Sequence, residues 1–188
     1  MPHEDRNALA AEIQEDVSRE DIALAFRAAM VGHFRAHVPG TNVNEQTLLS
    51  SDYLSHFHDL VMRFEALSTE TGGLAEELIY WRPMGYEEHF AQSGFRDKSL
   101  AIAAYRRAPA EIRANFDDAV ARLQGEALRL VARVGKAVDG PGDLAKTCLE
   151  GADRLRTLIG EADAIANGEM PAERGEALDP QEMARIAV

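Results

Sequence analysis

Apolar residues recur every three or four positions along most of this chain, and that spacing limits the fold more than any other feature. The spacing is close to the 3.6-residue turn of an α-helix. No segment shows the two-residue alternation of β-branched residues that is typical of a strand. The sequence therefore predicts an all-α fold. The clearest apolar stripe follows Pro109 and consists of Ile112, Phe116, Ala119, Leu123, Ala127, Leu130, Val134 and Val138.

Capping and breaking residues predict where the first helices begin and end. Ser18 is followed by acidic residues, which favours a helix start there, and Pro39-Gly40 ends that helix. Asn42 with Glu45 forms a capping-box pattern, so a second helix is expected from there to about Ser68. The apolar stripe of the first helix is expected to face the core. It contains Ile22, Phe26, Met30, His33, Phe34 and His37.

The second half of the chain predicts short helices and then a long hairpin. Residues 74–108 are expected to form shorter helical pieces, broken at Arg82-Pro83 and at Gly94. Gly140-Pro141-Gly142 separates the long helix after Pro109 from a last helix that ends at Asn167-Gly168. Helices joined by so short a turn pack antiparallel. We therefore expect an up-and-down helical bundle with a long C-terminal helical hairpin and short capping helices at one end.

The ends of the chain supply most of its formal net charge of −12. The pattern predicts an acidic N-terminal segment at 1–17, a bundle domain at 18–168 and an acidic C-terminal tail at 169–188. A chain of 188 residues fits one such domain. An acidic balance argues against a nucleic-acid partner, which needs a basic footprint.

The remaining composition narrows the class of protein. One cysteine rules out an internal disulfide framework, and Cys148 is expected in the core of the last helix. No apolar run is long enough to cross a bilayer, so no membrane partner is expected. The acidic start is unlike a secretory signal, and we expect a cytoplasmic protein.

Histidines provide one candidate site. His33 and His37 are four residues apart and share a helix face, as two ligands of one metal ion would. His58 and Glu65 on the next helix, or Glu88 and His89 further on, would complete a site for iron or zinc. In the alternative interpretation, His33 and His37 bond free carbonyls at a helix C-terminus and interact favourably with its dipole.

The segment His58-Asp59-Leu60 suggests another chemistry. It resembles the phosphoacceptor box of histidine kinases and bundle-type phosphotransfer proteins, in which an exposed histidine is followed by an acid. The match covers three residues. This resemblance implies a phosphotransfer or signalling adaptor, with His58 as the phosphorylated residue.

An aromatic middle segment provides a candidate interaction surface. Trp81, Arg82, Tyr86 and Phe90 lie in a stretch interrupted by proline and glycine, so one helical stripe cannot bury them all. Met183 and Ile186 in the tail form a short amphipathic segment that can dock on a partner. In the alternative interpretation the aromatic segment is a lid over the bundle's own core.

The function that these features favour is that of a non-enzymatic helical interaction or accessory protein, with a protein partner or a homo-oligomer. No Gly-rich phosphate loop, GxSxG elbow or recognisable catalytic triad is present in the sequence. The alternatives are a metal- or small-ligand-binding bundle that uses His33, His37, His58 and His89, and a phosphotransfer or signalling adaptor.

Overall fold

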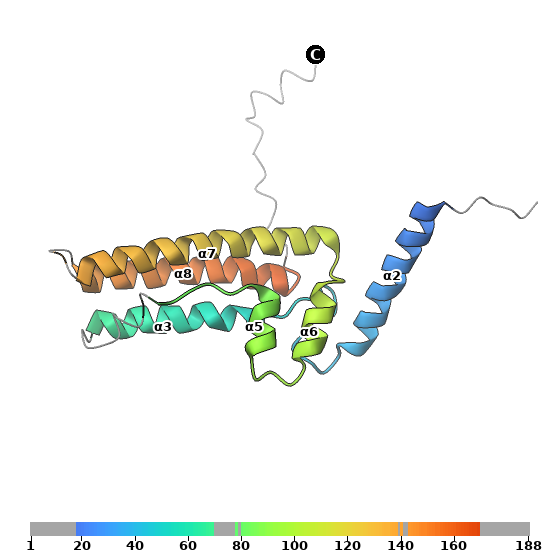
Figure 1. Ribbon diagram of the computed structural model, residues 1–188, viewed down its shortest axis with the longest axis horizontal. Coiled ribbons are helices and arrows are strands. Elements are labelled where there is room, and N and C mark those ends of the chain that lie inside the picture. The colour runs from blue at the N-terminus through green and yellow to red at the C-terminus, as the bar shows by residue number, and fades with distance from the viewer. Residues whose placement is uncertain (1–17, 70–77, 79, 139, 141–142, 170–188) are drawn as a thin grey trace, which may run out of the picture.

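Helix α8 (Leu144–Ala166) is the central element of the bundle, because it packs against both α7 (Ala110–Val138) and α3 (Ser55–Thr69) (Figure 1). The computed structural model describes residues 18–69, 78, 80–138, 140 and 143–169. These residues form α-helices and one 3₁₀ turn, with no strand among them. The prediction of an all-α helical bundle is confirmed.

The hairpin of α7 and α8 is built from the stripes that the sequence predicts. On α7 the buried residues run from Phe116 to Val134, whereas Val138 at the end is 42% exposed. Cys148 on α8 is fully buried, and burial raises the pKa of its thiol, as expected for a core cysteine. Asp143 begins α8 by accepting a hydrogen bond from the Lys146 amide at 2.9 Å.

Gly151 lets α3 and α8 approach closely. A Cβ at this position would lie 3.2 Å from two ring carbons of Phe64 on α3 and 3.5 Å from Leu130 on α7. Glycine inside a helix costs up to about 1 kcal/mol relative to alanine. The close packing of three helices at this point explains the residue.

The second helix begins later than the capping-box pattern predicts. Asn42 does not cap a helix, and its side-chain amide instead donates to Asp52 at 2.6 Å. The capping side chain is Asn44, which accepts from the amides of Gln46 and Thr47 within a non-helical loop. A 3₁₀ turn at Ser51–Leu54 then leads into α3. Asparagine side chains cap turns as well as helices, and Asn44 caps a turn of the loop here.

The loop over residues 42–50 closes the C-terminal end of α8. The Thr47 hydroxyl donates to the carbonyl of Ala166 at 2.6 Å, and the Asn44 amide donates to that of Asn167 at 3.3 Å. Leu48 adopts a left-handed backbone with φ of 59° and is fully buried. Burial and the bond from the Leu48 amide to the Asn44 carbonyl hold this unusual conformation.

Two short helices lie at the same end of the bundle, as predicted for residues 74–108. Helix α5 (Tyr86–Gln92) packs against α6 (Lys98–Tyr105), and α5 also contacts the 3₁₀ turn (Figure 1). Arg82-Pro83 and Gly94 lie outside both helices, where breaks are expected.

The first helix, α2 (Arg19–His37), has the predicted bounds but not the predicted environment. Ser18 and Asp21 form a reciprocal capping box, with the Asp21 amide 3.0 Å from the Ser18 hydroxyl. Within the described part of the chain, none of the α2 side chains is buried. The expectation that the apolar stripe of this helix faces the core is therefore wrong for Ile22, Phe26, His33 and His37, whereas Phe34 packs partly against the core.

Candidate functional site

Helix α2 exposes large apolar side chains to solvent. Ile22, Leu24 and Phe26 are 57%, 67% and 59% exposed. The helix stands apart from the bundle formed by α3, α7 and α8 (Figure 1). Exposed apolar side chains that gather on one element are typical of an interaction site.

The two sides of α2 have different roles. On one side Val31 and Phe34 pack partly against the core, and Arg35 Nη2 donates to the carbonyl of Gln46 at 3.0 Å. This side attaches the C-terminal half of the helix to the rest of the chain. Successive residues of an α-helix are rotated by about 100° around its axis. On the side opposite Val31, another set of residues falls within an arc of about 80°. We call this exposed set the outer stripe: Ile22, Phe26, Ala29, His33 and Ala36.

The imidazoles of His33 and His37 lie at this exposed surface and do not point into the core. Their ring centroids are 4.2 Å apart. The Nδ1 of His37 lies 2.7 Å from the carbonyl oxygen of His33, which can only accept, so Nδ1 donates. For His37, this contact at the end of α2 agrees with the alternative interpretation of a histidine bonded to a free helix carbonyl.

The other predicted metal ligands lie elsewhere and have other partners. On α3, His58 Nδ1 donates to the Leu54 carbonyl at 3.1 Å. Glu65 forms an ion pair with Arg156 of α8. His58 and Glu65 thus lie on α3 with partners of their own, whereas His33 and His37 lie on α2.

The pair on α5 is divided between solvent and core. Glu88 is exposed and accepts from Gln92 at 3.2 Å, whereas His89 is 8% exposed. Over the described ranges, no three His, Cys, Asp or Glu side chains are grouped so that they could hold a metal ion. The predicted set of metal ligands is thus not brought together.

The aromatic segment attaches to α3 through Trp81. The indole of Trp81 is stacked on the imidazole of His56, and His56 Nε2 donates to the carbonyl of Arg82 at 3.0 Å. Trp81 is partly buried, and the Arg82 side chain is exposed. Of the predicted interaction residues in this segment, Arg82 is the one that solvent reaches most.

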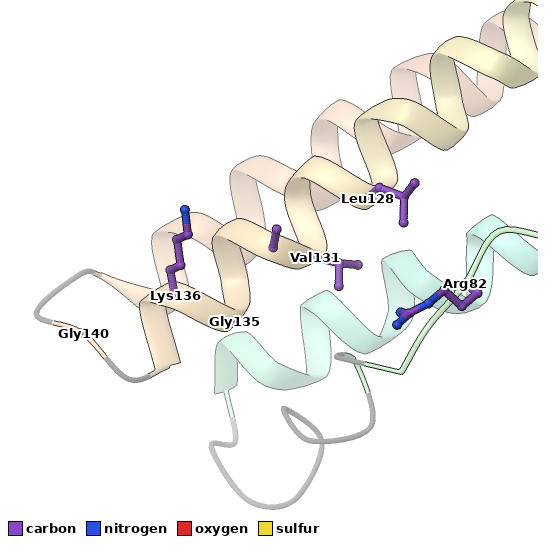
Figure 2. A pocket seen from close by; sticks show the side chains of 7 residues that line it. Arg82, Leu128, Val131, Gly135, Lys136 and Gly140 are labelled. Carbon is purple, nitrogen blue, oxygen red and sulfur yellow. The ribbon is translucent and has the colours of Figure 1, made fainter.

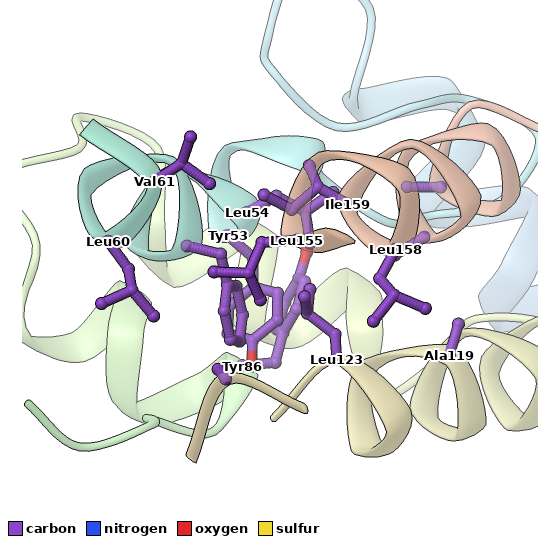
Figure 3. Packing of buried hydrophobic residues seen from close by; sticks show 14 of the residues in the cluster. Tyr53, Leu54, Leu60, Val61, Tyr86, Ala119, Leu123, Leu155, Leu158 and Ile159 are labelled. Carbon is purple, nitrogen blue, oxygen red and sulfur yellow. The ribbon is translucent and has the colours of Figure 1, made fainter. Parts of the chain in front are cut away.

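Tyr86 and Phe90 are core residues in this structure and do not form a surface. They are 6% and 2% exposed. The Tyr86 hydroxyl accepts from the Ser50 amide at 2.8 Å, and its ring stacks on Tyr105 at 4.4 Å. Figure 3 shows Tyr86 beside Tyr53 in the buried cluster. The lid interpretation describes these two residues, because their burial joins α5 to the loop before α3.

Burial shifts the pKa values of the ionisable groups at this end of the bundle. It lowers the pKa of His56 below the ordinary 6.5. The pKa of His89 is also lowered, first by burial and then by the nearby His56. Desolvation raises the pKa of Tyr53 to about 12. Burial thus favours the neutral form of both imidazoles.

A groove of about 670 Å³ runs beside α7 (Figure 2). Leu128 and Val131 lie along it, and Arg82 and Lys136 supply positive charge. Such a lining suits an anionic group attached to an apolar body.

A smaller pocket of about 270 Å³ lies between the loop before α3 and helices α5 and α6. Phe90 and Phe95 provide apolar surface, while Asp52, Arg96 and Asp97 provide charges of both signs. This lining has the chemistry to hold a small zwitterionic molecule.

Comparisons with protein-family models, with curated proteins and with solved structures find no match to this chain. Across the described helices, none combines the length and the apolar character needed to span a membrane. Met183 and Ile186, the predicted docking residues of the tail, lie outside the described residues.

The predicted stripe of α2 shares Ile22, Phe26 and His33 with the outer stripe, and the sequence did not predict that these residues are exposed. The distinguishing signal is composition, because beyond Phe26 the outer stripe contains only alanine and histidine. The buried stripe of α7, in contrast, continues with leucine and valine as far as Val134.

Proposed function

We propose that this chain is a non-enzymatic helical interaction protein that docks a partner helix on the outer stripe of α2. The observation that carries the proposal is the exposure of Ile22 and Phe26 on a helix that the bundle does not cover. Helix-to-helix docking uses apolar residues at this spacing.

The energetics of α2 favour a partner. A helix of 19 residues is close to the length at which isolated helices are marginal in water. Only its C-terminal half packs on the bundle, through Val31 and Phe34. Fully burying a side chain such as Ile22 or Phe26 contributes about 1.5–3 kcal/mol, before the cost of association is subtracted.

The charge pattern of α2 also suits docking. Between Ile22 and His37 the sequence has no acid, and its arginines, Arg27 and Arg35, are on the side away from the outer stripe. Residues flanking the stripe are small or apolar, among them Ala25 and Gly32. A partner can therefore approach the part of α2 from Ile22 onward without desolvating a full charge, whereas Arg19 in the first turn lies at the edge of the outer stripe.

The test compares Phe26→Ser with Leu24→Ser, since Leu24 is also largely exposed but lies on another side of the helix. Both variants should keep the wild-type melting temperature, because neither side chain is buried. Light scattering and calorimetry should show that only Phe26→Ser weakens association, whether with itself or with a purified, identified partner. Equal effects of the two variants, or none, would overturn the proposal.

A second candidate function, phosphotransfer, is favoured by the geometry of His58. His58 and Asp59 are exposed on α3. Because His58 Nδ1 donates to the Leu54 carbonyl, the lone pair of the neutral ring is on Nε2, which is then the available nucleophile. The experiment is phosphorylation by phosphoramidate, followed by mass spectrometry of peptides, with His33 as the internal reference. Selective, acid-labile labelling that His58→Gln removes would support this function, and equal labelling of exposed histidines would contradict it.

A further inference from the structure

We propose that the pocket of about 270 Å³ between the loop before α3 and helices α5 and α6 binds a small α-amino acid with an apolar side chain. This site is separate from the outer stripe of α2, so the proposal goes beyond the docking of a partner and does not depend on it. It rests on the size of the pocket, on the charged and polar side chains that line it and on its aromatic wall.

Three segments that are distant in the sequence build the pocket. The loop after α2 contributes Gly40 and Val43, the turn before α3 contributes Ser50 and Asp52, and the chain from α5 into α6 contributes the rest of the wall. The site therefore exists only in the folded chain. Its volume lies just below the range of roughly 300–1,000 Å³ that is typical of pockets for drug-sized ligands, so it suits a smaller molecule.

Two donors in the pocket suit the carboxylate of an amino acid. Arg96 is exposed, and its guanidinium forms no hydrogen bond or ion pair with another described residue. Ser50 is 1% exposed, and its hydroxyl accepts from the Asp52 amide at 3.4 Å. Among the described residues that hydroxyl donates to no acceptor, so its proton is available to a ligand. Hydrogen bonds from such donors to a carboxylate are charge-assisted and strong.

Two carboxylates in the pocket suit the ammonium group. Asp52 Oδ2 accepts from the Asn42 side-chain amide at 2.6 Å, while Oδ1 has no hydrogen-bond partner in the described part of the chain. Asp97 precedes α6 but makes no capping bond with its side chain. Together with Arg96, these residues give the lining one more negative than positive charge. A ligand with an ammonium group is therefore favoured over a simple anion.

Phe90 and Phe95 form the apolar wall of the pocket. Their ring centroids lie 5.7 Å apart, with 53° between the planes. Phe90 is 2% exposed and Phe95 is half-buried, so packing fixes both rings before a ligand arrives. An apolar side chain placed against these rings gains free energy by leaving water, whereas glycine would leave the wall wet.

The first measurement is calorimetric titration of the full chain with L-amino acids from alanine to phenylalanine. At least one should bind with a dissociation constant of about 1 mM or tighter, and it should raise the melting temperature because it binds the folded state. No binding at about 10 mM amino acid would overturn the proposal.

Analogues of the tightest binder then separate the two polar sides of the pocket. For leucine these are 3-methylbutylamine, which lacks the carboxylate, and 4-methylpentanoate, which lacks the ammonium group. Each should bind at least about tenfold more weakly than the amino acid. An analogue that binds as tightly as the amino acid would overturn the assignment of both groups.

Two matched pairs of variants locate the binding site. Arg96→Gln should weaken binding at least about tenfold, whereas Arg107→Gln, at an exposed arginine outside the pocket, should change it less than about twofold. The same contrast is expected between Asp97→Asn and Asp118→Asn. None of these side chains is buried, so circular dichroism should show wild-type folding for all four variants. Equal effects within either pair would place the amino acid elsewhere and overturn the proposal.

Discussion

The imidazole of His56 lies flat against the indole of Trp81, with ring centroids 4.9 Å apart and 13° between the planes. Because His56 is on α3 and Trp81 precedes α5, this stack joins two segments that are distant in the sequence. The Trp81 ring also lies 5.9 Å from Phe57 of the core. The stack is thus an attachment point for residues 80–85, which precede α5.

Replacing Trp81 should therefore destabilise the protein. We expect Trp81→Ala to lower the free energy of unfolding by about 2–4 kcal/mol, because it removes a partly buried ring and the stacking contact with His56. The neighbouring Tyr80 is 79% exposed, so Tyr80→Ala should cost less than about 0.5 kcal/mol. Urea denaturation followed by circular dichroism compares the two; equal losses would show that Trp81 is not an attachment point.

The lowered pKa values of His56 and His89 predict a loss of stability in acid. In the unfolded chain both imidazoles take up a proton near pH 6.5, whereas in the folded chain they do so only at lower pH. The unfolded state then binds more protons, so stability falls as the pH drops below 6.5 toward the folded pKa values. More than about one unit above pH 6.5 both states are deprotonated, and these groups contribute no further pH dependence.

Denaturant midpoints measured from pH 8 to pH 5 test this dependence. His56→Gln should reduce the slope of the denaturant midpoint against pH, because glutamine does not titrate and the contribution of His56 is lost. His58→Gln is the control, because His58 is exposed. If His56→Gln has the same slope as the wild type, the lowered pKa of His56 is not a source of the pH dependence.

Two leucines on α7 test which face of that helix is buried. Leu130 is 2% exposed and Leu128 is 43% exposed. Leu130→Ala should lower the free energy of unfolding by about 2–5 kcal/mol, whereas Leu128→Ala should cost well under about 1 kcal/mol. Chemical denaturation measures both, and a reversed order would mean that the packing face of α7 is misassigned.

Two glycines on α8 provide another matched pair. Nothing lies within 4 Å of a Cβ built at Gly160, so Gly160→Ala should raise stability by about 0.5–1 kcal/mol through helix propensity. At Gly151 the same substitution meets the Phe64 ring at 3.2 Å. Gly151→Ala should therefore show a smaller gain than Gly160→Ala, or a loss. Differential scanning calorimetry gives both shifts, and an equal gain at the two sites would rule out close packing at Gly151.

The sequence predicted best the elements whose signals are local. The stripe of α7, the break before α8 and the helix start at Ser18 depend on residues a few positions apart, and the structure agrees with each. The start of α3 was misplaced, because Asn42 and Asn44 are both competent caps. The choice between them depends on the bonds that Asn44 and Thr47 make with the distant end of α8.

Burial at the candidate sites could not be predicted for a related reason. An amphipathic pattern on α2 shows that one side is apolar, but it does not show what covers that side. Likewise, Tyr86 looks like an interface residue until the Ser50 amide, 36 positions earlier, is seen to bond its hydroxyl. Such contacts depend on how helices pack, and a single sequence contains no direct record of them.

The hydrogen bond from Thr47 to the Ala166 carbonyl has a consequence for the order of folding. It spans 119 positions, from the first loop of the bundle to the last turn of its last helix. During synthesis α3 and the loop before it emerge early, yet they cannot complete this end of the molecule until Ala166 has left the ribosome. The loop and the buried Leu48 must therefore wait for nearly the whole described chain, and closure of this end is a late, non-local step that is expected to slow folding.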